Sequence, residues 1–198
     1  MAKHRVWYRV GQFTEALRAT FEPVDETYVQ RHLGHTEHST DLLRLFRTMP
    51  RTEQHHGAKV CRVLEHHGDT DPDLFIAALL HDVGKTIAPP RLWERVLVVL
   101  AEHFAARQVE IYRRSPSTQE STDRNVPRGI RRPFVVRRHH AQWGAELAAE
   151  AGAPSRTAAL IRHHHDPAGN EPQRRDGMDP EDVRLSPLLE ALQAADET

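Results

Sequence analysis

The chain has 198 residues, a length that suits one domain with a substantial buried core. A formal net charge of −1 and the lack of an apolar run of about 18 residues give no reason to expect nucleic-acid or membrane binding. The single cysteine excludes an intrachain disulfide, and the N-terminus lacks the apolar stretch of a signal peptide, so we expect a cytoplasmic protein.

Helical periodicity dominates the chain, whereas the polar–apolar alternation typical of a strand is absent. Proline and glycine punctuate the helical periods. Pro72 falls in an expected first turn, and Gly68 is a candidate C-cap. The sequence therefore predicts an all-α fold. The expected helices span residues 12–21, 24–34, 38–48, 51–67, 72–83, 90–113, 138–151, 154–165 and 184–197.

Two long segments lack a helical period. Residues 114–137 form a polar, arginine-rich loop that is too long for a simple connection, and residues 166–182 form a second such loop. Residues 1–49 carry a core-type leucine stripe but no catalytic pattern. We expect them to form an N-terminal helical extension packed on a domain that spans residues 50–198.

The adjacent residues His81 and Asp82 are the most informative in the chain, because they follow the apolar run Ala77–Leu80. Buried polar groups cost several kcal/mol unless a partner satisfies them. A bound metal ion is one such partner, and an ion pair at a capped helix end is the alternative. The doublet therefore predicts a buried site at this helix end.

Four further elements place a histidine or an aspartate on an apolar stripe of three- and four-residue spacing. Neighbouring histidines are less favourable candidates. His55 is rotated by about 100° from the stripe of its helix, and His139 shares its face with Trp143, Glu146 and Glu150. The preferred candidates are His56, His140, His164, His165 and Asp196.

These residues resemble the H…HD…D signature of the HD superfamily of metal-dependent phosphohydrolases, which is named for its His–Asp doublet. His56 matches the first histidine, His81 and Asp82 match the doublet, and Asp196 matches the last aspartate. The resemblance covers roughly residues 50–198 and implies an all-α, HD-domain helical bundle.

Two more segments resemble the HD-GYP branch of that superfamily. His140 and Gly144 fit an H-x-x-x-G segment, and the run from Ile161 to Asp166 is similar to I-x-x-H-H-E. Asp166 stands where that branch has glutamate, no Gly-Tyr-Pro triplet follows, and about 57 residues separate the doublet from His140.

The resemblance implies one or two divalent ions, with Asp82 as the bridging ligand. Imidazole and carboxylate ligands suit Mn, Fe, Co, Ni or Zn, and Mg is a further candidate. His56, His81 and Asp196 would complete a first site. The other three histidines would hold a second ion, bind substrate oxygens or pack as neutral side chains; they are His140, His164 and His165.

Basic residues near the doublet suggest how a phosphate would be bound. Lys85 lies one turn after Asp82, where it would neutralise phosphate oxygens or serve as a solvated helix-end cation. Arg137 and Arg138 end the arginine-rich segment, and arginine pairs with phosphate in a bidentate way. Solvation of that segment is the alternative. Asp82 and Lys85 are the candidate catalytic residues.

We expect an enzyme that cleaves a phosphate ester or anhydride with metal-activated water. By resemblance, its substrate is a small phosphorylated molecule, with nucleotides as the leading class, and its partners include neither nucleic acid nor a membrane. Three alternatives stay open. They are a cyclic-dinucleotide phosphodiesterase, a dinuclear-iron oxygenase with the same ligand set, and a sensor that binds a nucleotide without turnover.

Overall fold

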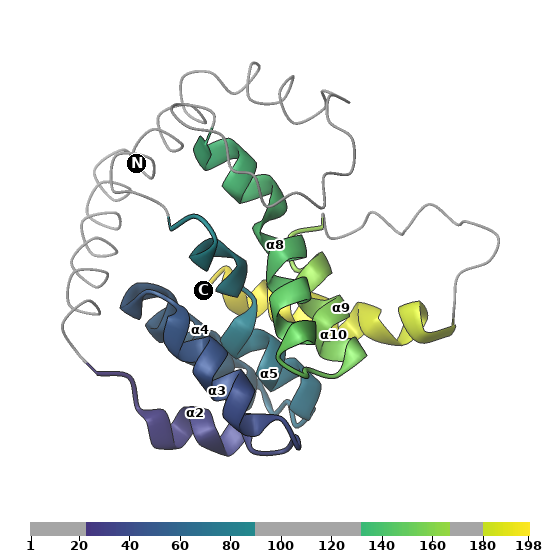
Figure 1. Cartoon of the computed structure of the whole chain (residues 1–198). Coiled ribbons are helices and arrows are strands. Elements are labelled where there is room, and N and C mark those ends of the chain that lie inside the picture. The colour runs from purple at the N-terminus through teal and green to yellow at the C-terminus, as the bar shows by residue number, and fades with distance from the viewer. Residues whose placement is uncertain (1–22, 90–131, 167–179) are drawn as a thin grey trace, which may run out of the picture.

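The computed structural model describes residues 23–89, 132–166 and 180–198 (Figure 1). All regular elements in these ranges are helical, which confirms the all-α prediction. Helices predicted at residues 12–21 and 90–113 lie outside the described residues. The described elements are α2 (Glu26–Leu33), α3 (Ser39–Thr48), α4 (Arg51–His67), α5 (Pro72–Leu80), the 3₁₀ helix η1 (Val83–Thr86), α8 (Arg132–Glu150), α9 (Ser155–His163) and α10 (Pro180–Asp196).

Local sequence signals set the turn between α4 and α5. Gly68 has a φ of 89°, a left-handed conformation that glycine adopts without steric cost, and it ends α4. The Asp71 side chain accepts hydrogen bonds from the backbone N–H groups of Asp73 and Leu74, and Pro72 occupies the first turn of α5. Both features agree with the sequence-based boundaries.

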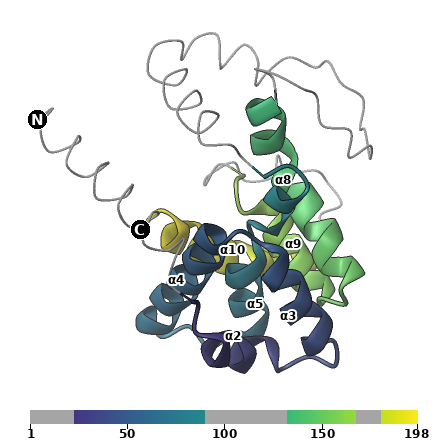
Figure 2. The ribbon, with the colours of Figure 1, turned by 60° about the vertical axis from the view of Figure 1, so that its left-hand side comes forward.

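Helix α5 lies at the centre of the bundle. Every residue from 74 to 80 is buried, and α5 contacts α2, α4, α9 and α10 (Figures 1 and 2). Because this helix is covered on all sides, its continuous apolar run is explained by burial. Its C-terminal end delivers His81 and Asp82 to the interior of the protein.

Helices α2 and α3 share the core of the other helices, since Val29, Leu42 and Phe46 belong to the same buried cluster as Leu64 and Leu79. The division into an extension at 1–49 and a domain at 50–198 stays a prediction. Among the described helices, none is long and apolar enough to cross a membrane.

Two loop predictions were wrong at their ends. Helix α8 begins at Arg132, so residues 132–137 are helical, and α10 begins at Pro180 inside the predicted loop 166–182. Val136 packs with Trp143 and Ala88 in a small apolar cluster. This packing stabilises the start of α8, although the arginine-rich sequence there predicts a loop. A proline in that first turn, Pro133, lacks only an N–H that the helix leaves unpaired there. Residues 114–131 lie outside the described residues.

Candidate metal centre

The doublet sits in the turn between α5 and η1, because the helix ends at Leu80 rather than at the predicted residue 83. His81 is the C-cap of α5, and Asp82 precedes η1. Their exposed fractions are 1% and 4%. A carboxylate and an imidazole are therefore both held away from water, where they need partners.

Three buried histidines share one hydrogen-bonding pattern. Nδ1 of His81 donates to the Ala78 carbonyl at 2.9 Å, Nδ1 of His140 lies 3.1 and 3.0 Å from the carbonyls of residues 136 and 137, and Nδ1 of His164 donates to the carbonyl of residue 161 at 2.6 Å. The helix carbonyls thus fix the tautomer, so that in the neutral ring the lone pair is on Nε2. In all three residues Nε2 is buried without a hydrogen-bond partner among the described residues.

That pattern is the one in which histidines bind metals, since the second ring nitrogen orients the ligand. The only other buried nitrogen without a hydrogen bond in the described ranges is Nε2 of His32, which lies 3.2 Å from a Glu65 carboxylate oxygen. An unpaired buried nitrogen is costly, so three of them converging on one place indicate a ligand. The donor set fits a divalent metal ion.

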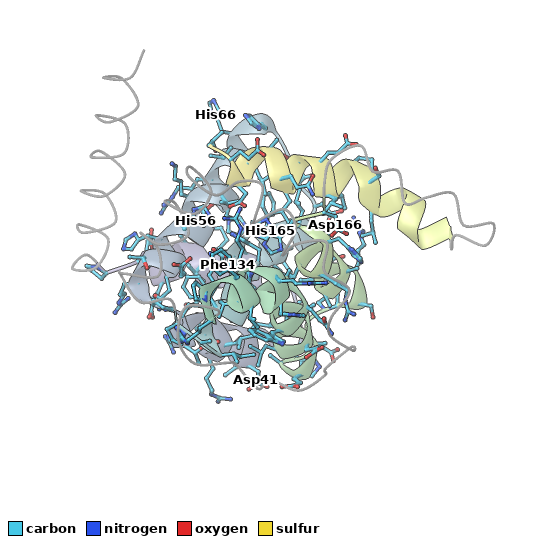
Figure 3. All side chains as sticks on the ribbon, turned by 90° about the horizontal axis from the view of Figure 1, so that it is seen from above. Asp41, His56, His66, Phe134, His165 and Asp166 are labelled. Atoms are coloured by element: carbon cyan, nitrogen blue, oxygen red, sulfur yellow. The ribbon has the colours of Figure 1, made fainter. Side chains whose placement is uncertain are left out.

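His56, His81 and Asp196 form the first group, with their ligand atoms all within 4.8 Å of one another. Nε2 of His56 donates to Oδ1 of Asp196 at 2.6 Å, and Nε2 of His81 lies 3.4 Å from the same oxygen. Helices α4 and α10 bring together residues that are 140 positions apart. Figure 3 shows His56 toward the centre of the bundle, whereas His66 lies at its edge.

His140, His164 and His165 form the second group, again with ligand atoms within 4.8 Å of one another. The ring centroids of His140 and His165 are 4.9 Å apart, and those of His164 and His165 are 4.1 Å apart. The rings of His81 and His164 are also in contact, at 5.1 Å. The two groups are therefore adjacent. His165 is the one exposed member of the second group.

Asp82 stands between the two groups. Its Oδ2 atom lies 3.5 Å from Nε2 of His81, and its Oδ1 atom lies 3.6 Å from Nε2 of His140. Each carboxylate oxygen thus faces one group. If each group held a divalent ion, Asp82 would be the carboxylate placed to serve both.

Lys85 contacts the same oxygen of Asp82 that faces His81, and Glu53 lies beside the lysine. Nζ of Lys85 donates to Oδ2 of Asp82 at 2.6 Å and to Oε2 of Glu53 at 3.3 Å. Burial lowers the pKa of Lys85, but the carboxylates of Asp82 and Glu53 outweigh it and raise that pKa. Lys85 is therefore charged and held beside the candidate bridge.

Sequence reasoning missed Glu53, which is only 6% exposed. Its position three residues before His56 places it on the same face of α4, and this spacing was the available signal. A glutamate in the first turn of a helix is ordinarily explained by the helix dipole, so the residue did not stand out.

Two of the three buried histidines are neutral at pH 7, and the third, His81, is protonated in the absence of metal. Burial lowers the pKa of His140 to about 4 and that of His164 to about 2, so both imidazoles are neutral at pH 7. Burial also acts to lower the pKa of His81, but Asp82 and Asp196 overcome it and raise that pKa to about 9. Lys85 and His81 keep the pKa of Asp82 well below its ordinary value despite burial. A metal ion at the first group would replace the proton on His81.

A close backbone contact fixes the two groups relative to each other. Helix α8 passes so near η1 that a β-carbon on Gly84 would overlap the carbonyl oxygen of His140. A β-carbon on Gly144 would lie 3.2 Å from both the Gly84 nitrogen and the Ile161 side chain. Two glycines therefore allow the close approach that places His140 beside Asp82.

The arginines proposed to bind phosphate lie on α8, not on a loop. Both Arg137 and Arg138 are exposed, and Arg138 is rotated by about 200° around the helix from His140. His139 stacks on Trp143 with ring centroids 5.7 Å apart, on the face expected from their spacing.

The structure is thus an all-helical protein whose interior holds adjacent imidazole and carboxylate groups that could bind metal ions. A family model for the HD domain matches residues 37–198, so the chain belongs to the HD-domain family. Membership of this family indicates metal-dependent phosphohydrolase activity in general terms. The comparisons with curated proteins and with solved structures returned no match.

Proposed function

We propose that this protein hydrolyses a phosphate ester or anhydride of a small molecule, and that its substrate is a nucleotide. The observation that carries the proposal is the convergence of three buried Nε2 atoms without a hydrogen bond, two of them facing Asp82 and the third on His164, whose ring contacts those of His81 and His140. Nitrogen atoms in this state are ready to bind divalent metal, and the family supplies the link from such metal to phosphate chemistry.

Each residue of the two groups has a defined part in this proposal. His56, His81 and Asp196 hold a first ion, His140, His164 and His165 hold a second, and Asp82 bridges them. When bound, the ions lower the pKa of a water molecule toward neutrality and stabilise charge on the phosphoryl oxygens. The low pKa of Asp82 keeps the bridge ionised, so that it ligates over the whole physiological pH range.

Lys85 binds a phosphate oxygen in this proposal, and Glu53 holds the lysine at the site. When both Asp82 oxygens face metal, Lys85 keeps its contact with Glu53 and can turn its remaining N–H donors to substrate. Arg137 and Arg138 bind outer phosphates only if the substrate reaches over the exposed face of α8. A cytoplasmic location, favoured by the single cysteine, belongs to the same proposal.

A substrate and metal screen tests the proposed function. Purified full-length protein, stripped of metal and reloaded with Mn, Fe, Co, Ni, Zn or Mg, is assayed against phosphomonoesters, nucleoside triphosphates and cyclic dinucleotides. We expect turnover of a mononucleotide, lost in His140→Ala. Turnover of cyclic dinucleotides alone indicates the phosphodiesterase alternative, O₂ consumption by the iron form indicates the oxygenase, and nucleotide binding without turnover indicates the sensor. Any of these three outcomes contradicts the proposal.

A further inference from the structure

Gln193 bridges the helix that carries Asp196 and the turn that carries His164 and His165. It lies on α10, one turn before Asp196. Its Nε2 atom donates to the Asp166 carbonyl at 2.8 Å and lies 3.5 Å from the His163 carbonyl. These two carbonyls stand immediately before and immediately after the His164–His165 pair, so a single amide brackets both candidate ligands.

His165 is the ligand that needs such support. Nδ1 of His81, His140 and His164 is anchored on a carbonyl of its own helix. His165 has no hydrogen bond to its ring in the described part of the chain, and its side chain is exposed. Its described ring contacts are with His140 and His164. The position of its ring therefore depends on the backbone of the turn, which follows the end of α9.

Helix α10, which carries Gln193, is itself held in place by the rest of the bundle. Leu192 and Ala195 are buried in the core on either side of it. Nε2 of His56 donates to Asp196, and Nζ of Lys59 donates to the Thr198 carbonyl at 3.2 Å. Helix α10 is thus tied to α4 one turn beyond Gln193. On the far side of the turn, an ion pair between His163 and Asp166 at 2.7 Å links its two ends to each other but not to the bundle.

We propose that Gln193 is a positioning residue that holds the His164–His165 turn against α10 and thereby keeps the ligand atoms of the second group in place. The effect passes through His165, whose ring has no hydrogen bond of its own. The inference rests on the proposed function in one respect, that the second group binds a metal ion. It adds that the affinity for this ion depends on the contact between α10 and the turn.

Cobalt binding tests the inference, because Co²⁺ reports its ligand geometry in its visible absorption spectrum. The full-length protein is stripped of metal and titrated with Co²⁺ alone, with bound metal measured by elemental analysis. Gln193→Ala removes the amide, and Gln193→Glu keeps its size but removes the N–H donor. The control is Gln142→Ala, which removes an exposed glutamine of α8 that bonds only Glu146 in the described structure, at 3.2 Å.

We expect both Gln193 variants to bind the second Co²⁺ about tenfold more weakly, with a changed spectrum, because one hydrogen bond is lost. The first Co²⁺ should bind as in wild type, and Gln142→Ala should match wild type throughout. Wild-type binding of both ions by Gln193→Glu would overturn the inference. Any weaker binding by Gln193→Ala would then result from lost packing and not from the lost N–H donor. Equal weakening of both ions would also overturn it.

Amide hydrogen exchange in the metal-free protein separates this inference from the proposed function. Residues 164–166 should exchange faster in both Gln193 variants than in Gln142→Ala, whatever the number of ions that wild type binds. A wild-type protein that takes one Co²⁺ would contradict the two-ion centre. Unchanged exchange in the turn would overturn the role of Gln193.

Discussion

At the scale of single residues, Asp82 is the group that contacts both halves of the proposed centre. It faces His81 with one oxygen and His140 with the other, and it also neutralises Lys85. Removing its charge therefore does more than delete one ligand. It leaves the half-buried Lys85 with Glu53 as its remaining carboxylate partner, and it removes the carboxylate between the two groups of imidazoles.

We expect Asp82→Ala to lose nearly all bound metal and all hydrolysis. The free energy of unfolding should fall by about 2 kcal/mol, because a charged hydrogen bond is lost while Lys85 keeps Glu53 as a partner. Elemental analysis and urea unfolding measure the two effects. Asp41→Ala, which removes an exposed carboxylate paired with Arg44, is the control and should change neither by much. Equal metal content in Asp82→Ala and wild type would contradict the site.

Helical periodicity singled out residues that the structure brings together in two groups, but Glu53 was missed although it lies on the same face of α4 as His56. The apolar face alone favoured His56 and His140 over their neighbours. The structure buries His140 more deeply than His139, whereas His55 and His56 are both half-buried. The metal-binding role of these residues stays a prediction. The contact of Lys85 with Glu53 joins residues 32 positions apart, so it depends on how α4 packs beside η1, which no local pattern encodes.

At the scale of elements, glycine, proline and capping residues predicted the helix ends that depend on neighbouring residues alone. Gly68 and Asp71 act through their own backbone neighbours, so they were visible in the sequence. The start of α8 was missed because its first turn is stabilised by packing of Val136 on Ala88 and Trp143, a contact across distant segments. Polar composition there indicated a loop, and tertiary packing overrode it.

The contact between η1 and α8 leads to a prediction about Gly84. We expect Gly84→Ala to lower the free energy of unfolding by at least about 2 kcal/mol, because its β-carbon would meet backbone that cannot move aside. Helix α8 would shift and carry His140 away from Asp82, so the second ion should also be lost. Urea unfolding and elemental analysis measure both effects.

Gly68→Ala is the matched comparison for that variant. Gly68 has a positive φ but no atom within 4 Å of a built β-carbon, so alanine there should cost only about 1–2 kcal/mol of backbone strain. Its metal content should stay at the wild-type level. If Gly84→Ala retained both ions, close packing of η1 and α8 would not be what positions the second group.

The packing of α2 on α4 and α5 buries His32 and makes stability depend on pH. Burial lowers the pKa of His32 below its ordinary 6.5, and the nearby Glu65 carboxylate offsets this only in part. Below pH 6.5 the unfolded chain therefore binds a proton that the folded protein does not. The free energy of unfolding should fall as the pH falls from 7.5 to 5.5, by at most about 1.4 kcal/mol per pH unit for this one group.

We expect His32→Gln to show a smaller fall over that pH range than wild type. Urea unfolding at both pH values, with a chelator present, measures the difference and removes any contribution from metal. His140 and His164 contribute with the same sign in both proteins, so they cancel in the comparison. His66→Gln, at an exposed position on α4, should keep the full wild-type fall. An identical pH dependence in His32→Gln would contradict the burial argument.

At the scale of the whole molecule, the centre closes the bundle by joining α10 to α4. Helix α10 is held by the buried residues Leu192 and Ala195, by the contact of Asp196 with His56, and by the contact of Thr198 with Lys59. In both ribbon views the C-terminal end of α10 lies beside α4 (Figures 1 and 2). A ligand in the last helical turn is therefore supported from two sides, although such a turn would ordinarily fray.

We expect deletion of residues 194–198 to abolish hydrolysis and remove the first ion, because Asp196 is lost. Most of the helical circular dichroism signal should persist, since Leu192 and the preceding turns still pack on the core. Deletion of residues 197–198 alone is the control. It removes the contact between Thr198 and Lys59 but keeps Asp196 and its hydrogen bond with His56, so metal content and activity should stay near wild type. Hydrolysis by the longer deletion would remove Asp196 from the first group, and loss of helix in both deletions would show that the end of α10 supports the fold rather than the metal.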